Sequence, residues 1–330
     1  MTTRTAIVGA GIAGLTLARD LRDAGHQVTI FDKARGPGGR MAARRVEAST
    51  IDHGAQFFTA TDPGFRQAVD QWSVHGVVAV WAPRYARIAA DGSISLERDA
   101  RTRFVGTPRM SAITRDLSRG LDLHCEHRIA AITGGIGDWH LHDDNHDGFG
   151  PYDQVLLALP APQAQELLDP HGFGLEVLGA TRVAPCWAGL FSFDQALAVD
   201  WDAADCDHGP LAWLARNNSK PARGRKETWI VHANPEWSQA NLGREPADVI
   251  DDLRTAFADL VGNLPEPTYA KAHRWRFAKV IQAAPKPSLY DCSLGLGACG
   301  DWGLVGKVEG AWLSAKHLAE QIAACAIKAA

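Results

Sequence analysis

The sequence predicts an α/β fold, in which a parallel nucleotide-binding sheet is interrupted by a second domain built on antiparallel strands. Three observations predict it: a glycine-rich turn near the start of the chain, a glycine pair soon after it, and a glycine-rich turn near the end. Between these segments the hydrophobic pattern changes from helical spacing to alternation, which is typical of antiparallel strands.

The first turn reads Gly9-x-Gly11-x-x-Gly14 and lies between a short apolar run and a helical pattern, and the next apolar run ends on Asp32. The order of strand, turn, helix, strand and acid is the dinucleotide-binding pattern of a Rossmann-type unit. Gly9 permits the tight turn, Gly11 lets a pyrophosphate approach the backbone, and Gly14 lets helix and strand pack closely. The helix N-terminus favours the phosphates, and Asp32 is expected to bind a ribose.

The segment after Asp32 favours a flavin over a nicotinamide as the tightly held cofactor. Gly38 and Gly39 are adjacent and are followed by Arg40. Two adjacent glycines let the backbone pass close to a bulky flat ligand. Arg40 can donate charge-assisted hydrogen bonds to phosphate oxygens. The alternative is a glycine-rich surface loop with a solvated arginine.

Near the end of the chain a strand is predicted to end on Gly300 and Asp301, and a glycine-rich turn then opens a long helix. The carboxylate can bind ribityl hydroxyls, and the helix dipole can stabilise the reduced, anionic flavin. An ordinary helix capped by a glycine-rich turn is the alternative. Together the three segments predict FAD. It is expected to be held non-covalently, because the sequence shows no Cys-Tyr pair of the kind used for covalent flavin attachment.

Four segments closely resemble bacterial renalases, which belong to the amine-oxidase-like group of FAD-dependent flavoproteins: residues 35–45, 52–59, 213–221 and 300–314. The resemblance implies a two-domain fold like that of amine oxidases and p-hydroxybenzoate hydroxylase, with a Rossmann-type FAD-binding domain and an inserted α+β substrate domain. It also implies an oxidase of misreduced dihydro-NAD(P) isomers, the 2- or 6-dihydro forms. Hydride transfer to flavin N5 and reoxidation by O2 would then give NAD(P)⁺ and H2O2.

The chain departs from the renalase pattern at four positions. Renalases tend to have a hydrophobic residue in place of His53, tyrosine in place of Phe57 and Phe277, and arginine in place of Lys307. Two hydroxyls that could contact the substrate are therefore missing. The sequence leaves both dihydro isomers, and both NAD and NADP, open as substrates.

The three segments and the resemblance define the expected site. No side chain is expected to act as an acid or base, because hydride transfer to a flavin needs stacking, close approach and a favourable field. The expected substrate-lining residues are Gln56, Phe57, Phe58, Trp187 and Trp302. The expected cofactor-binding residues are Gly9, Gly11, Ile12, Ala13, Gly14, Asp32, Lys33, Gly39, Arg40, Met41, Gly54, Ala55, Ile129, Gly300, Asp301, Lys307, Val308 and Glu309.

Rival functions remain open. The first is an amine oxidase of the monoamine or polyamine type, whose site favours tyrosines beside the flavin. This chain has four tyrosines, and none lies near the C-terminal glycine-rich turn. The second rival is a non-catalytic flavin redox sensor, and a third is a nicotinamide dehydrogenase without flavin.

The pattern assigns residues 1–60, 105–162 and 276–330 to a discontinuous FAD-binding domain, and residues 61–104 and 163–275 to the substrate domain. The active site is expected between the two domains.

Local signals predict further elements. Thr107-Pro108 is interpreted as the start of a helix, and residues 246–261 as a helix that stops at Gly262. Residues 139–150 contain three histidines among acidic residues. They are interpreted as a hairpin with a solvated tip rather than as a metal site, and no metal is expected.

The charge balance bears on partners. The net charge is −4, from 34 basic and 38 acidic residues, which argues against a nucleic-acid partner. The basic run from Lys220 to Lys226 is interpreted as a solvated loop, with attraction of an anionic dinucleotide substrate as the alternative. The expected partners are a dihydronicotinamide dinucleotide and molecular oxygen.

The six cysteines form no Cys-x-x-Cys pair and fit no structural zinc pattern. They are expected to be reduced thiols in a cytoplasmic enzyme. The first strand begins too early in the chain to leave room for a signal peptide, and the absence of an eighteen-residue apolar run argues against a membrane partner.

Overall fold

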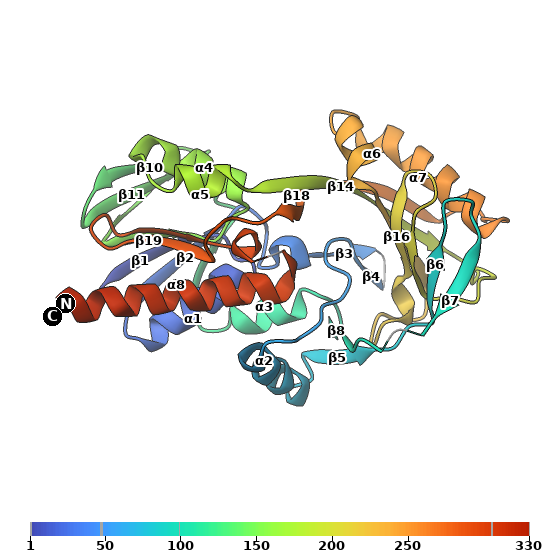
Figure 1. Cartoon of the computed structure of the whole chain (residues 1–330), viewed down its shortest axis with the longest axis horizontal. Coiled ribbons are helices and arrows are strands. Elements are labelled where there is room, and N and C mark those ends of the chain that lie inside the picture. Colours follow the sequence, from blue (N-terminus) through green and yellow to red (C-terminus); the bar gives the residue numbers. More distant parts are fainter. Residues whose placement is uncertain (1, 47–48, 99, 305, 330) are drawn as a thin grey trace.

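The computed structural model describes residues 2–46, 49–98, 100–304 and 306–329. Two large sheets lie at opposite ends of an elongated molecule (Figure 1). The first is mostly parallel and the second mostly antiparallel. The α/β class with an inserted α+β domain, predicted from the sequence, is confirmed.

The first sheet has six strands. In spatial order they are β19 (Ser288–Asp291), β20 (Leu296–Cys299), β13 (Gln154–Leu157), β1 (Arg4–Val8), β2 (Gln27–Asp32) and β9 (Asp122–Cys125). All are parallel except β19. β2 and β13 lie on opposite sides of β1. The carboxyl end of β1 is therefore the topological switch point, which is where such sheets bind ligands.

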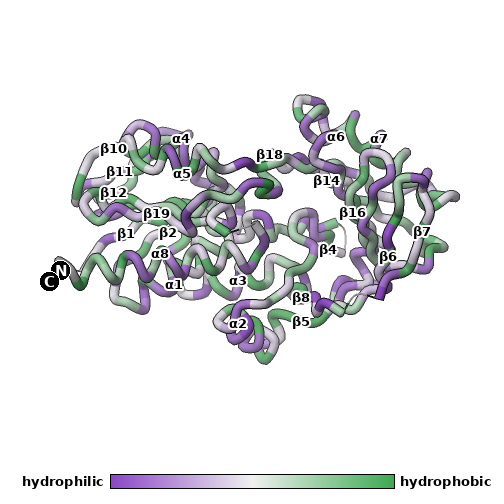
Figure 2. Tube along the Cα trace, viewed as in Figure 1, coloured by the Kyte–Doolittle hydropathy of each residue, from purple (hydrophilic) through white to green (hydrophobic). Residues whose placement is uncertain are grey.

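Both faces of this sheet are covered, as its apolar strands require. Along β1, Ile7 packs on one face with the helices α1 (Ile12–Asp23) and α8 (Lys307–Ala329). Ala6 and Val8 pack on the other face. In Figure 2, α1 and α8 alternate between apolar and polar residues, as helices that cover a sheet do.

The opposite face is covered by a three-stranded sheet and two helices. These elements are β10 (Ile129–Gly135), β11 (Asp138–Asp143), β12 (Gly148–Tyr152), α4 (Ala161–Leu168) and α5 (Leu175–Gly179). The predicted hairpin at residues 139–150 is therefore confirmed as β11 and β12.

The second sheet has seven strands. In spatial order they are β18 (Tyr269–Gln282), β14 (Arg182–Phe193), β17 (Glu227–Ala233), β16 (Leu211–Arg216), β15 (Ala203–Cys206), β6 (Tyr85–Ile88) and β7 (Ile94–Glu97). A buried aromatic core, which includes Trp229 and Phe257, packs this sheet against α7 (Pro246–Val261). The predicted helix at 246–261 is confirmed.

Short strands, helices and 3₁₀ turns make up the rest of the described fold. They are β3 (Ala43–Val46), β4 (Ser49–Asp52), α2 (Pro63–Val74), β5 (Val78–Trp81), β8 (Arg103–Gly106), α3 (Ala112–Leu117), α6 (Pro235–Ala240) and the 3₁₀ turns η1 (Gly39–Met41), η2 (Asp169–His171), η3 (Asn217–Ser219) and η4 (Asp301–Gly303). Within the described ranges, no helix is both long and apolar enough to span a membrane.

The expected domain boundaries at 61 and 163 both fall too early. α4 and α5, beyond residue 163, pack on the first sheet. α2, beyond residue 61, packs Phe65 against Trp312 of α8, with ring centroids 5.5 Å apart. The sequence of an amphipathic helix does not show which of two cores the helix packs on. The change from helical spacing to alternation therefore assigned these helices to the wrong domain.

The predicted helix start at Thr107-Pro108 is wrong, because α3 begins at Ala112. The Thr107 N–H donates to Val77 O at 2.8 Å, and its hydroxyl donates to Gly76 O. These bonds to the chain just before β5 hold the residue in extended structure.

The expectation that all cysteines are reduced is also wrong. Cys292, in the turn between β19 and β20, is bonded to Cys325 on α8, with Cα atoms 6.0 Å apart. The other four cysteines are free. The disulfide spans 33 positions of the sequence, and these include β20, Asp301 and the start of α8.

We expect the Cys292→Ser variant to be less stable than the wild type by about 2–4 kcal/mol, because a loop of this length loses much chain entropy when it is closed. The melting temperature should fall by about 3–6 °C. Thermal unfolding with and without dithiothreitol measures it. Cys125→Ser, which leaves the bond in place, is the control. An equal effect of dithiothreitol on Cys292→Ser and wild type would contradict the prediction.

Candidate functional site

The three glycine-rich segments predicted to bind the cofactor lie together at the carboxyl end of β1. A Cβ on Gly39 would lie 3.2 Å from the Cα of Gly11, so the second segment lies against the first. Arg40 donates from Nη1 and Nη2 to the two oxygens of Asp301, at 2.7 and 2.5 Å, which joins the second segment to the third.

The glycines of the first turn have different roles. A Cβ on Gly14 would lie 1.9 Å from Gly9 O, and a Cβ on Gly9 would lie 2.5 Å from Ala158 O, so protein packing excludes both. Gly11 is the N-cap of α1, and a Cβ there would meet no protein atom within 4 Å. The side of the turn that faces away from the protein is thus open beside the free N–H groups of α1, and it fits a pyrophosphate.

The carboxyl end of β2 suits a ribose of the dinucleotide. Asp32 accepts the N–H groups of Ala10 and Ala34, at 2.6 and 2.8 Å. These bonds fix the carboxylate, and each oxygen keeps a lone pair for a ribose hydroxyl. The His127 N–H donates to Asp32 O at 3.0 Å, and the predicted residue Ile129 follows two positions later in the chain.

Other predicted cofactor residues gather around Arg40 and Asp301. The Ala55 N–H donates to Arg40 O at 2.8 Å, and a Cβ on Gly54 would lie 2.0 Å from the same oxygen. The N–H of Gly306, just before α8, donates to Asp301 O at 3.0 Å. The N-terminus of α8 therefore lies beside the ion pair, next to the predicted residues Lys307 and Val308.

Glu309 differs from its expected role. Its carboxylate accepts the N–H groups of Thr61 and Asp62, both at 2.6 Å, and the hydroxyl of Thr61 at 2.8 Å. The side chain thus fixes the start of α2 against α8, and only the backbone of Glu309, in the first turn of α8, is left for the expected contact with a cofactor.

A buried ion cluster lies behind the Gly54–Phe57 segment. The Asp52 carboxylate accepts Arg223 Nε and Nη2, at 3.0 and 2.7 Å, Lys220 Nζ at 3.3 Å and the Met110 N–H at 2.9 Å. All three charged side chains are fully buried. The expected solvated loop is therefore wrong for Lys220 and Arg223, because both point inward to this carboxylate.

The cluster shifts both pKa values. Burial alone would raise the pKa of Asp52, but attraction to Lys220 and Arg223 outweighs it and leaves that pKa below its usual value. Burial lowers the pKa of Lys220 to about 8, and attraction to Asp52 offsets it only in part.

A row of side chains crosses the second sheet toward the first domain. Trp213 on β16 pairs with His232 on β17, His232 pairs with Ala188 on β14, and Ala188 pairs with His273 on β18. Residues directly opposite in a sheet point to the same face, so these four form one surface. Its outer members, Trp213 and His273, contact residues of the 53–57 segment.

At one end of the row, His273 and Trp275 contact His53. The His53 ring is stacked on Trp275, with centroids 5.2 Å apart, and its carbonyl accepts the Trp275 Nε1–H at 2.8 Å. Burial lowers the pKa of His53 to about 3, and those of His232 and His273 to about 4. All three imidazoles are therefore uncharged near neutral pH.

At the other end, Phe57 is partly exposed among aromatic rings and one cation. Its ring centroid lies 6.2 Å from that of Trp213 and 6.1 Å from that of Trp81. The Arg103 guanidinium lies 5.2 Å from it and 4.2 Å from the Tyr85 ring.

The remaining expected substrate-lining residues are enclosed by protein. Trp187 and Trp302 are fully buried, and their indole N–H groups donate to Asn241 O and Leu159 O. Phe58 is buried in the core, and the buried Gln56 amide is bonded to Asp52, Gly54 and Lys220. The expectation that these four line the substrate site is not supported by their packing.

Sequence reasoning missed the residues that do lie opposite the Gly54–Phe57 segment: Trp213, His232, His273 and Trp275. The alternation of His273 and Trp275 along one strand was an available signal, because it places both side chains on one face. The pairing with His232 was not available, since it depends on the sheet register.

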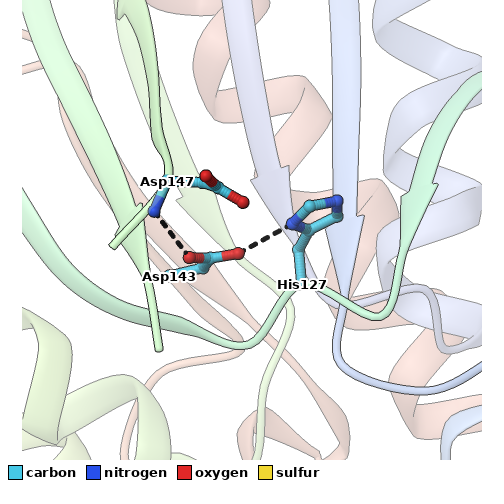
Figure 3. A group of neighbouring side chains, drawn as sticks. All are labelled: His127, Asp143 and Asp147. Atoms are coloured by element: carbon cyan, nitrogen blue, oxygen red, sulfur yellow. Dashed lines mark hydrogen bonds and ion pairs between the residues drawn. The ribbon is translucent and has the colours of Figure 1, made fainter. Parts of the chain in front are cut away.

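A separate group, His127, Asp143 and Asp147, has its ligand atoms within 4.8 Å of one another (Figure 3). Asp143 Oδ2 accepts His127 Nδ1 at 2.8 Å, and Oδ1 accepts the N–H groups of Asn145 and Asp147, both at 2.9 Å. The central carboxylate thus joins the β11–β12 turn to His127, in the chain just before β10.

Two family models match the chain. Residues 7–72 match the NAD(P)-binding Rossmann-like domain, and residues 73–323 match the flavin containing amine oxidoreductase family. Curated relatives match only a short segment. A hydroxyneurosporene desaturase from Rubrivivax gelatinosus is 48% identical over 58 residues, 18% of this chain and 11% of its own. A 4,4'-diapophytoene desaturase from Staphylococcus haemolyticus is 44% identical over 57 residues, 17% of this chain and 11% of its own.

Solved structures match over nearly the whole chain. A protein from Exiguobacterium sp. 255-15, provisionally named a protoporphyrinogen oxidase, has a TM-score of 0.76 at 14% identity, with 98% of this chain and 99% of that chain covered. A putrescine oxidase bound to putrescine has a TM-score of 0.72 at 12% identity, with the same coverage. At such identities the likeness concerns the fold.

We expect Gly11→Val to fold and to lose its bound cofactor. Its backbone conformation suits any residue and its Cβ meets no protein atom, whereas a branched side chain would occupy the place of the pyrophosphate. Visible absorbance and melting temperature of the purified protein measure both effects. The control is Gly243→Val, which also meets no protein atom. Full flavin content in Gly11→Val would refute this interpretation of the turn.

We expect the free energy of unfolding to fall as the pH is lowered from 6.5 to 4. The unfolded chain takes up protons on His53, His232 and His273 near pH 6.5, while the folded chain does so only near pH 3–4. The stability present above pH 6.5 is therefore lost on acidification, on the order of 3 kcal/mol at pH 4 for His53.

The pH dependence can be tested by urea unfolding at several pH values. His53→Phe keeps a flat ring on Trp275 and cannot take up a proton, so its stability should fall less steeply with acid. Exposed His146, changed to Asn, is the control. Equal acid sensitivity of His53→Phe and wild type would contradict the assignment.

Proposed function

The chain belongs to the flavin containing amine oxidoreductase family, and on that premise we propose that it is an FAD-dependent oxidase of misreduced dihydro-NAD(P) isomers, like the renalases that it resembles. The proposed partners are a dihydronicotinamide dinucleotide and molecular oxygen. The 2- and 6-dihydro isomers are both candidate substrates.

The uncharged surface opposite the Gly54–Phe57 segment carries the proposal. Its side chains are indoles and imidazoles, and the depressed pKa values keep His53, His232 and His273 neutral. A dihydronicotinamide ring is also flat and uncharged, and its carboxamide can both donate to and accept from a neutral imidazole. His53 Nδ1 and His232 Nε2 are buried and have no protein partner.

This surface suits a protonated amine less well. A buried cation requires a carboxylate or another anionic partner. Asp52, the carboxylate behind the Gly54–Phe57 segment, is fully buried and is already paired with Lys220 and Arg223. The row from Trp213 to His273 contains no acidic residue. The next residue in register beyond Trp213 is Asp205 on β15, whose carboxylate is hydrogen-bonded to Tyr85.

The residues fit FAD, as judged by the open side of Gly11 and the convergence of the three segments. Gly11 and α1 would hold the pyrophosphate, and Asp32 would hold a ribose. The Arg40–Asp301 ion pair would lie beside the part of the cofactor between its phosphates and its ring. When bound, FAD supplies the hydride acceptor at N5, and its reoxidation by O2 releases hydrogen peroxide. The protein orients the two rings and excludes water, and the oxidised substrate leaves as NAD(P)⁺.

An amine oxidase is the second candidate. The family assignment and the fold shared with a putrescine oxidase favour it. It requires that an amine bind in its uncharged form or pair with Asp205, which lies directly opposite Trp213 in the sheet.

Anaerobic stopped-flow mixing separates the two functions. We expect the 2- and 6-dihydro isomers of NAD, separated from the 4-dihydro isomer after borohydride reduction, to bleach the flavin at least about 100-fold faster than putrescine or 4-dihydro-NAD, as the resemblance to renalases implies. In air, steady peroxide release should accompany turnover, which a redox sensor would not give. Rapid bleaching by putrescine and none by the dihydro isomers would reverse the assignment.

A further inference from the structure

We propose that Lys220 is a positioning residue, which acts through Gln56 to fix the Gly54–Phe57 segment between the cofactor and the substrate. This inference relies on the proposed function only for the reaction that the segment serves. Its evidence lies in the buried cluster, which the hydride-transfer chemistry leaves unused.

Lys220 determines which way the Gln56 amide faces. The Lys220 ammonium can only donate, and it donates to Gln56 Oε1 at 2.7 Å. The amide nitrogen must then face the other way, where it donates to Asp52 O and Gly54 O, at 2.7 and 3.0 Å. A flipped amide would set its N–H groups against the ammonium and its oxygen against two carbonyls.

The Gln56 amide in turn closes the chain from Asp52 to Gln56 into a tight turn. Within this turn the Ala55 N–H is bonded to Arg40 O, and the residue after it is Phe57. A change at Gln56 should therefore shift two things: the bond from Ala55 to Arg40, in the second glycine-rich segment, and the position of the Phe57 ring.

Asp52 does not require Lys220. Without the lysine, its carboxylate still accepts two bonds from Arg223 and one from Met110. Lys220 also lies closer to Gln56 Oε1 than to Asp52 Oδ2, at 2.7 against 3.3 Å. The closer bond indicates that Gln56, more than Asp52, is the partner that Lys220 serves.

The charges of the cluster make this bond pH-dependent. One carboxylate faces two cations, so the fully charged cluster carries an excess positive charge in a buried place. Loss of a proton from Lys220 leaves a neutral Asp52–Arg223 pair, in agreement with the pKa of about 8. His232 on β17 also faces Lys220 and stays neutral, and the Trp81 ring on β5 lies 5.5 Å from its Nζ.

The test uses flavin-loaded Lys220→Met, Gln56→Met and the double variant. The first readout, the visible spectrum of the bound flavin between pH 6 and 10, needs no substrate. We expect a wild-type spectral change with an apparent pKa near 8 that is absent from all three variants. Gln56→Met leaves every charge of the cluster in place, so it keeps the test decisive should Lys220→Met fold poorly.

The second readout is the rate of flavin reduction by the substrate that bleaches the wild type. Each single variant should lose about tenfold, and the double variant no more than either, because residues that act through one another are non-additive. Arg225→Met changes an exposed cation of the same loop and should leave both readouts unchanged.

Two results would overturn the proposal: a spectral change near pH 8 that persists in Lys220→Met or Gln56→Met, or losses of rate that multiply in the double variant. Failure of every dihydronicotinamide to bleach the wild-type flavin would instead refute the proposed function. In that case the pH titration of the spectrum would still decide the role of Lys220.

Discussion

The paired hydrogen bonds between Arg40 and Asp301 hold together two parts of the nucleotide-binding domain that are 261 positions apart in the chain. The Asp301 side chain is only 8% exposed, and its partner 27%, so the pair is shielded from water and the fork geometry of arginine fixes its direction. The first turn, the Gly54–Phe57 segment and the N-terminus of α8 are all arranged around it. The sheet already brings the first turn and Asp301 to one edge, because they follow the parallel strands β1 and β20, and the ion pair adds the second segment to them.

The parts of the site that the sequence predicted are those with a local cause. A turn such as Gly9 to Gly14 admits few residue types, because close backbone approach excludes a Cβ. Lys220 shows the opposite case. A basic run is usually solvated, and only the fold reveals that a carboxylate 168 positions away in the chain accepts its bond. The partners of the Glu309 side chain, Thr61 and Asp62, were hidden for the same reason, since they lie far from it in sequence.

The second domain was predicted in class but not in detail. The strands and the helix at 246–261 follow from alternation and helical spacing. The row formed by Trp213, His232, Ala188 and His273 depends on register between strands that are far apart in the chain, and a shift of one residue would turn each side chain to the other face. Trp187 was expected in the site because indoles bind flat rings, yet its place in the sheet buries it in the core.

The two longest strands, β14 and β18, contribute to both cores. Val183 and Val280 pack with the first sheet, while Trp187 and Ala272 pack with the second. The strands are paired antiparallel along most of their length (Figure 1). The ribbon joins the two domains, and the register shift between Ala184 and Cys186 marks a point where its strands bend and twist more strongly.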